Sequence, residues 1–176
     1  MPYVDPQTIS NPTTGQVAPA SWGDGVRDAT QYLSGGFPHA SIYETSAQSI
    51  SNNTETNLTS SHENSDIGGM HSTSSNTDRI TIPSGEGGLY RMDAVITFAS
   101  NATGYRVLNF RVNGVTDYNV VVADGNSASS APTTLSGGRS VVLSAGDYIV
   151  VRVYQNSGGA LNCTLLDFTV RWVATA

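Results

Sequence analysis

Residues 79–114 read RITIPSGEGGLYRMDAVITFASNATGYRVLNFRVNG, and this stretch indicates the fold class. It holds two runs in which apolar and polar residues alternate, the pattern of strands that bury one face. In the run 89–98 the even positions are apolar, and in the second run one face carries Leu108, Phe110 and Val112. The turn dipeptide Asn113-Gly114 follows the second run. We expect the two runs to pair as antiparallel strands with one face in the core.

The rest of the chain contains further short strands separated by turn-forming residues. Residues 45–78 are rich in Ser, Thr, Asn and Asp, so we expect only edge strands there. The strands expected outside the opening stretch are 37–43, 48–51, 56–60, 115–123, 133–143 with an interruption at Gly137-Gly138, 148–155 and 161–173. This number of short strands predicts a two-sheet β-sandwich, most simply a jelly roll.

The composition limits the classes of partner. The chain has 176 residues, a formal net charge of -6 and an isoelectric point near 4.7. Binding through phosphates needs clustered cations, so no nucleic-acid partner is expected. No membrane partner is expected either, because no stretch approaches ~20 apolar residues and residues 1–16 lack the pattern of a signal peptide. The single cysteine, Cys163, cannot form an intrachain disulfide, which fits synthesis in a cytosol.

The first 36 residues differ in composition from the rest. Prolines and small polar residues in 1–17 are typical of an extended arm. Apolar residues at i, i+4, i+7 and i+11 then predict one short helix within 18–36. We expect two parts, an anchoring arm with this helix at 1–36 and a β-sandwich domain at 37–176. The helix would dock on a larger assembly through Trp22, Val26, Arg27 and Leu33, and the alternative is that it packs on the chain's own β domain.

Several short motifs carry a resemblance to a known family. They are Gly69-Met70-His71, Ile82-Pro83 leading to Gly88-Leu89-Tyr90, Arg111-Val112-Asn113-Gly114 and Gly146-Asp147-Tyr148. Over residues 43–173 the chain resembles the C1q/TNF-like jelly-roll domains of tailed-bacteriophage virion structural proteins. Residues 14–33, TGQVAPASWGDGVRDATQYL, resemble the N-terminal leader of phage structural proteins.

The resemblance implies an all-β jelly roll that assembles as a homotrimer. It implies that Tyr148, Arg152 and Tyr154, on the outward face of the strand 148–155, contact neighbouring subunits. Without a partner these side chains would form an exposed patch that monomers usually avoid. The collagen-like or coiled-coil stalk of the family is absent from this sequence, so trimerisation would rest on the β domain and the arm.

The sequence offers little that indicates catalysis. The three histidines have no HxH or HExxH spacing, and no serine lies in a GxSxG motif. His62, Glu63, Asp66 and His71 share one polar loop, where they either hold a cation or form ordinary hydrogen bonds, with His71 fixing a turn. The glycine-rich Ser84–Gly88 precedes a strand, so it predicts a turn and no phosphate site. We expect no enzyme activity, no cofactor and no metal.

These observations combine into a structural role. The first hypothesis is a bacteriophage virion protein, a trimeric capsid decoration or minor capsid protein that is made in the host cytoplasm and binds the major capsid protein or another virion protein. The alternative is a tail-fibre or baseplate adhesin that binds a host surface glycan through the loops of 45–78. That loop region has no aromatic residue, which disfavours a sugar site built from it alone.

Overall fold

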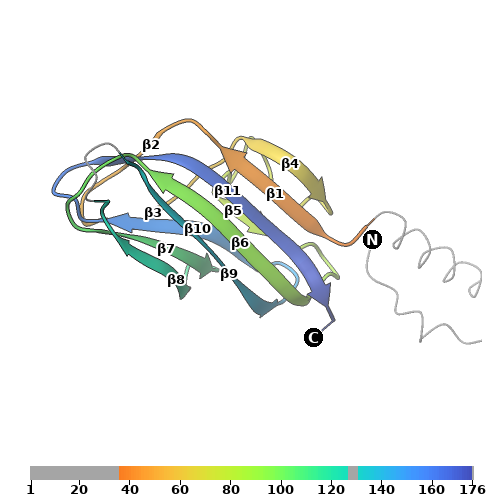
Figure 1. The fold of residues 1–176 in the computed structure, drawn as a ribbon. Coiled ribbons are helices and arrows are strands. Elements are labelled where there is room, and N and C mark those ends of the chain that lie inside the picture. Colours follow the sequence, from red (N-terminus) through yellow and green to blue (C-terminus); the bar gives the residue numbers. More distant parts are fainter. Residues whose placement is uncertain (1–35, 127–130, 176) are drawn as a thin grey trace, which may run out of the picture.

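The computed structural model describes residues 36–126 and 131–175, and these form two antiparallel sheets packed face to face (Figure 1). The predicted arm and helix, with Trp22, Val26, Arg27 and Leu33, lie outside the described residues. The strands are β1 (His39–Glu44), β2 (Gln48–Ile50), β3 (Thr56–Asn57), β4 (His62–Ile67), β5 (Arg79–Thr81), β6 (Gly88–Phe98), β7 (Tyr105–Val112), β8 (Thr116–Asp124), β9 (Thr133–Leu143), β10 (Tyr148–Gln155) and β11 (Leu161–Ala174).

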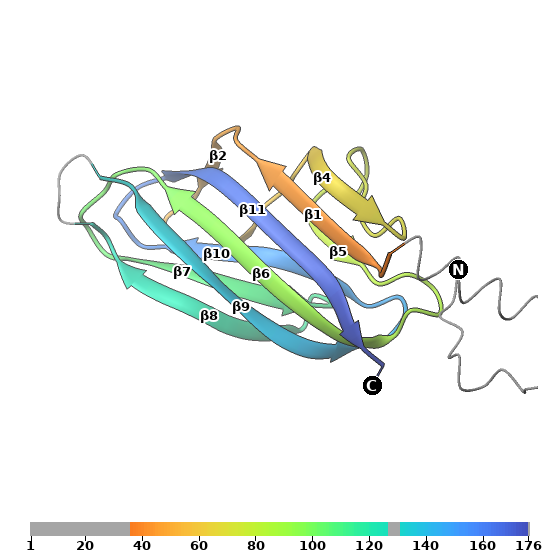
Figure 2. The same cartoon turned by 45° about the vertical axis from the view of Figure 1, so that its right-hand side comes forward.

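Each sheet combines strands that are far apart in the sequence. The first sheet has the order β4-β1-β11-β6-β9, with β2 also paired to β11, and the second has the order β3-β10-β7-β8, with β5 also paired to β10. Figures 1 and 2 show the two layers with their strands running along the same long axis of the sandwich. The predicted all-β sandwich is therefore confirmed for the described residues.

The expected pairing of the two strands in 79–114 is wrong. β6 pairs with β11 and β9 in the first sheet, whereas β7 pairs with β10 and β8 in the second. The segment 99–104 crosses between the sheets, and the buried faces of the two strands meet across the core. Alternation identifies the buried face of a strand, but it carries no information about which strand lies beside it. β9, β10 and β11 also lie alternately in the first and the second sheet, so these consecutive strands form no hairpins with one another.

The hairpin at Asn113-Gly114 is confirmed, since it joins the paired strands β7 and β8. Asn113 has φ 53° and Gly114 has φ 67°, the positive values that the two central residues of a type I′ turn require, and Val115 completes a three-residue loop because Val112 pairs with Thr116. The amide of Val115 donates to the carbonyl of Val112 at 3.0 Å and closes the turn.

Two strand predictions change in detail. β9 runs through Gly137-Gly138 without a break. A side chain on Gly138 would meet the Met92 carbonyl and the Asp93 carboxylate, so glycine here permits close pairing with β6. β4 was not expected, because its sequence HENSDI has no apolar alternation. It forms by adding to the edge of β1, with a register shift at Ser41/Ile42.

The core is filled by the alternating apolar residues of both sheets. Phe110 of β7 and Phe168 of β11 stack across it with ring centroids 5.5 Å apart. The Arg106 side chain is also buried, and its guanidinium donates to the carbonyls of Asn101, Thr103 and Tyr105 at 3.0–3.1 Å. These bonds tie the crossing segment 99–104 to the end of β7. Burial lowers the pKa of the Arg106 guanidinium.

The start of β1 and the end of β11 lie at the same end of the sandwich, because His39 pairs with Arg171. Phe37 stacks on Trp172 at 5.0 Å, and the Trp172 amide donates to the Pro38 carbonyl at 2.9 Å. The chain before β1 thus joins the first sheet beside the C-terminal strand. Within 36–126 and 131–175 no helix is long and apolar enough to cross a membrane.

Candidate functional site

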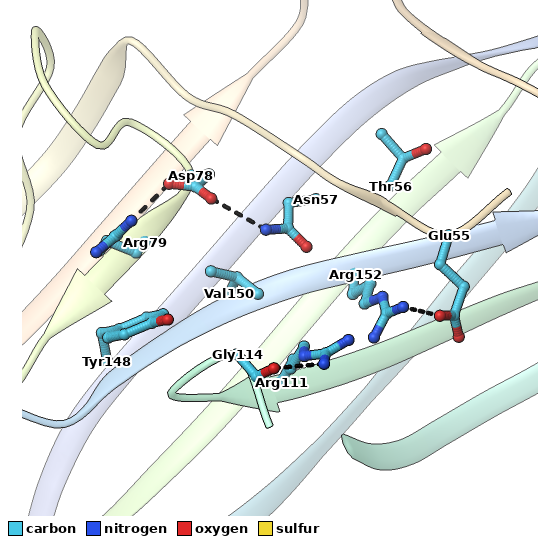
Figure 3. Close-up of a pocket in the computed structure, with 10 residues that line it drawn as sticks. All are labelled: Glu55, Thr56, Asn57, Asp78, Arg79, Arg111, Gly114, Tyr148, Val150 and Arg152. Carbon is cyan, nitrogen blue, oxygen red and sulfur yellow. Dashed lines mark hydrogen bonds and ion pairs between the residues drawn. The ribbon is translucent and has the colours of Figure 1, made fainter. Parts of the chain in front are cut away.

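The outer face of the second sheet carries a trough of about 500 Å³ along the middle of β10 (Figure 3). Its lining includes three guanidinium groups and two carboxylates. We call it the β10 trough, and its residues are Glu55, Thr56, Asn57, Asp78, Arg79, Arg111, Gly114, Tyr148, Val150 and Arg152.

The sheet register places these side chains. Val150 lies on the outer face of β10 as the floor of the trough and is 1% exposed. Its partner on β5 is Arg79, and its partner on β7 is Arg111, so a guanidinium rises on either side of it. Asn57 of β3 pairs with Arg152 one outer-face position further along. Strand pairing thus fixes the cations on a rigid frame.

One end of the trough is organised by Arg152. Its guanidinium forms an ion pair with Glu55 and donates to both carboxylate oxygens of Asp117 on β8, at 3.1 and 3.2 Å. Arg111 lies 3.8 Å from the same Asp117 and donates to the carbonyl of Gly114. The hairpin turn and the neighbouring strand therefore hold both cations in place.

The other end is organised by Arg79. Its guanidinium lies over the ring of Tyr148, 4.4 Å from the ring centroid, and its Nε is 3.6 Å from Asp78 Oδ1. Asn57 Nδ2 donates to the second oxygen of Asp78 at 3.0 Å and bridges the gap between β3 and β5. With Asp117 included, three guanidiniums face three carboxylates, so the formal charges of the site balance.

The residues predicted for subunit contacts lie on this face. Tyr148 and Arg152 line the trough, as described, and Tyr154 lies further along β10. The Tyr154 ring stacks on Tyr105 at 5.5 Å, and its hydroxyl donates to Asn53 Oδ1 at 2.9 Å. Desolvation and the neighbouring Tyr105 raise the pKa of Tyr154. All three side chains have partners within the chain, and their role in a trimer stays a prediction.

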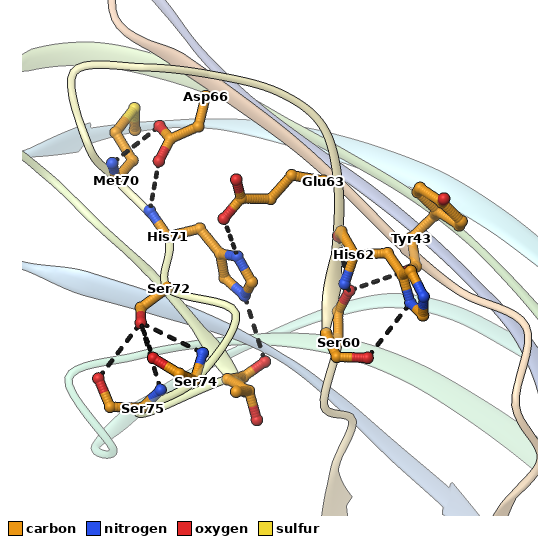
Figure 4. A network of polar contacts seen from close by, with 12 residues as sticks. Tyr43, Ser60, His62, Glu63, Asp66, Met70, His71, Ser72, Ser74 and Ser75 are labelled. Carbon is orange, nitrogen blue, oxygen red and sulfur yellow. Dashed lines mark hydrogen bonds and ion pairs between the residues drawn. The ribbon is translucent and has the colours of Figure 1, made fainter.

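The polar loop that the sequence offered as a cation site divides into separate contacts (Figure 4). His71 Nδ1 lies 2.8 Å from Glu63 Oε1, and its Nε2 lies 3.4 Å from the Thr77 carbonyl. Asp66 accepts the backbone amides of Met70 and His71, at 2.8 and 3.1 Å, and so fixes the turn after β4.

The fourth residue of that group points elsewhere. The His62 ring lies beside Tyr43, with centroids 5.1 Å apart and planes tilted by 31°, and its Nδ1 lies 3.4 Å from the Glu44 carboxylate. Across the part of the chain that the structure describes, no three His, Cys, Asp or Glu side chains gather in a way that could hold a metal ion.

Cys163 is buried in β11, and burial raises the pKa of its thiol to about 11. The reactive form of cysteine is the thiolate, so a group with this pKa is a weak nucleophile at neutral pH. Its Sγ contacts the Leu165 carbonyl at 3.3 Å, which fits a packing role.

Sequence reasoning missed most of the trough. Its cations and acids come from the loops before β3 and β5, from β5 itself, from β7 and from β10, and no local motif links them. The signal that was available is the outward position of Arg111 in its alternating run. The polar loops of 45–78 contain no Phe, Tyr or Trp, but the fold places Tyr148 of β10 beside Asn57 and Asp78 of these loops.

Comparison with known proteins establishes the fold. No protein-family model and no curated protein sequence matches the chain. Solved structures similar to it include the globular domain of a zebrafish complement 1qA protein, with a TM-score of 0.57 and 14% identity over 79% of this chain and 99% of that chain. Vertex protein P5 of the phage PRD1 has a TM-score of 0.58 and 20% identity over 78% and 99%. Murine APRIL has a TM-score of 0.52 and 14% identity over 76% and 98%. The described part of the chain therefore has the C1q/TNF-like jelly-roll fold.

Proposed function

We propose that this chain is a non-enzymatic structural protein of a bacteriophage virion, a homotrimeric capsid decoration or minor capsid protein anchored by residues 1–36. The observation that supports this role most directly is the similarity of fold to the PRD1 vertex protein over nearly all of that chain. The phage-like leader at 14–33 supports it independently, since it comes from a part of the sequence outside the jelly roll.

Anchoring would act through apolar burial. Each of Trp22, Val26 and Leu33 contributes roughly 1.5–3 kcal/mol when fully buried, before the cost of ordering the arm. Three arms in one trimer would bind through avidity, with the second and third contacts made at high effective concentration. The described chain begins at residue 36, and β1 pairs with β11 in the first sheet, not with a strand of the second sheet.

The test is incorporation into particles. Deletion of residues 1–36 should leave a trimer in light scattering at micromolar concentration and abolish its co-purification with capsids. Trp22→Ser combined with Leu33→Ser should weaken incorporation in the full-length chain. A monomeric mass for the intact protein would contradict the trimer, and full incorporation without the arm would contradict its role as anchor.

A second function is supported by one observation, the β10 trough. It places Tyr148 beside Asn57 and Asp78 of the polar loop region, the combination of ring, amide and carboxylate that the loops alone lacked. We propose as the alternative that the chain is a tail-fibre or baseplate adhesin that recognises a host surface glycan. Binding of the purified full-length protein to host cells would support this function, and absence of such binding would reject it.

A further inference from the structure

We infer that the β10 trough binds a neutral saccharide, through hydroxyl groups that bridge its guanidinium and carboxylate side chains. This inference rests on the adhesin function proposed as the alternative, and it adds the position of the site and the chemical class of the ligand. It is independent of the anchoring role of residues 1–36.

The charge balance of the trough selects a neutral ligand. An anion bound between Arg79 and Arg111 would also face Asp78, Asp117 and Glu55. A cation would meet the three guanidiniums, and at these separations like charges repel strongly in a partly desolvated site. The overall charge of -6 further disfavours polyanions at long range. A group that carries no charge avoids both penalties.

The hydrogen-bonding capacity selects a polyhydroxyl ligand. Within the described part of the chain, the Arg79 guanidinium forms an ion pair with Asp78 at 3.6 Å and lies over the Tyr148 ring, and it forms no hydrogen bond with protein atoms. Its Nη donors are therefore free for a ligand. Asp78 and Glu55 remain partly exposed, with side-chain exposures of 25% and 43%, and they accept hydrogen bonds. A hydroxyl donates one hydrogen bond and accepts others, so adjacent hydroxyls can donate to a carboxylate and accept from a guanidinium at the same time.

The shape of the trough argues against an apolar peptide. A peptide that docks by its side chains needs apolar pockets, whereas here the one aliphatic side chain in the lining, Val150, is 1% exposed. Tyr148 is the aromatic ring of the lining, and the Arg79 guanidinium lies over it, 4.4 Å from the ring centroid. The volume of about 500 Å³ lies within the range of small-molecule sites. The frame is preorganised, since β5, β7 and β10 are joined by strand pairing.

The experiment uses the full-length protein on a printed array that carries neutral oligosaccharides beside their carboxylated counterparts. The trough variants are Arg79→Gln and Asp78→Asn. The matched controls are Arg91→Gln and Asp93→Asn, which alter an ion pair of 2.6 Å on the outer face of the first sheet, with exposures of 36% and 41%. Thermal melts establish that every variant is folded. The best neutral glycan is then titrated in solution at about 50 mM and about 500 mM salt.

We expect the wild type and both control variants to bind neutral glycans with equal affinity. Each trough variant should lose on the order of tenfold to a hundredfold, the effect of removing a charged hydrogen-bonding partner. The affinity should change little with salt.

Three outcomes would overturn the inference: binding that the trough variants leave intact, a preference for carboxylated glycans that is lost at high salt, or no binding to any neutral glycan on the array. If the protein still binds host cells in any of these cases, the adhesin function stands and only the site or its ligand is wrong. If the wild type binds neither glycans nor cells, both are rejected, and the virion role is judged separately by incorporation.

Discussion

The crossing of the chain between sheets after β6 can be tested through one pair of rings. Phe110 of β7 and Phe168 of β11 are 0% and 1% exposed, and their rings stack at 5.5 Å with planes 26° apart. They touch because β7 lies in one sheet and β11 in the other. If β6 and β7 were neighbours in one sheet, as the sequence pattern suggested, this contact would not be expected.

The perturbation is a double-mutant cycle with Phe110→Leu and Phe168→Leu. Each single substitution removes part of a fully buried ring and should lower the free energy of unfolding by about 1–2 kcal/mol. Offset aromatic pairs contribute about 0.5–1.5 kcal/mol beyond their buried area. The double variant should therefore be more stable than the sum of the two losses predicts, by that coupling energy.

The assay is urea unfolding. An unchanged slope m in every variant shows that the folded and unfolded states keep their compactness. Phe98→Leu with Phe168→Leu is the control. Phe168 pairs with Ala94, and Phe98 lies four residues further along β6, roughly 13 Å away at about 3.3 Å per residue. The control pair should be additive within about 0.5 kcal/mol. Additivity of the Phe110 and Phe168 changes as well would refute the proposed packing of β7 on β11.

Three other predictions concern single residues. Burial alone raises the pKa of Glu44, but hydrogen bonds from Ser46 and Ser61 outweigh burial and lower the pKa to about 2. The ionised Glu44 carboxylate therefore stabilises the fold above about pH 4.5, and this contribution is lost as the pH falls toward 2. Glu44→Gln should cost about 1–3 kcal/mol in urea unfolding at pH 7 and little at pH 2; an equal cost at both pH values would contradict this. Because the pKa of Cys163 is raised to about 11, a disulfide reagent at pH 8 should react with it slowly in the folded protein and rapidly in urea, and stability should fall as the pH rises from about 9 through 11. Gly104 has φ 67°, and a Cβ there would overlap Asn156, so Gly104→Ala should lose about 2–3 kcal/mol; the control Gly159→Ala, with open space around it, should change by less than about 0.5 kcal/mol in calorimetry.

Local patterns predicted strands well where each strand buries one face. The alternation in 89–98 fits β6 position by position, and the two glycine-containing turns at Asn113-Gly114 and Ser84–Gly88 were expected from residue type. Such features depend on neighbours in sequence. Strand order depends on contacts between segments more than 100 residues apart, such as β2 with β11, and short-range patterns do not encode them.

The candidate site was less predictable for the same reason. Arg79, Arg111 and Arg152 are separated by more than thirty residues each, and they meet only because β5 and β7 flank β10. Their positions on the outer face follow from alternation once the register is known. Sequence reasoning identified Tyr148 and Arg152 as outward residues, which the structure confirms, but it interpreted them as subunit contacts without the carboxylates that surround them.

The two roles given to Tyr148 and Arg152 exclude each other. A trimer contact through the outer face of β10 would close the trough, whereas a saccharide site needs it open. In the isolated chain the Arg152 guanidinium already has Glu55 and Asp117 as partners, so a neighbouring subunit would gain little from it without displacing an ion pair. A substitution of Tyr154 distinguishes a trimer contact from a saccharide site, because Tyr154 lies on the same face but outside the trough lining. If Tyr154→Ser leaves the trimer mass unchanged in light scattering, the outer face of the second sheet is free and the trough can serve a ligand; if the variant is a monomer, this face is the trimer contact.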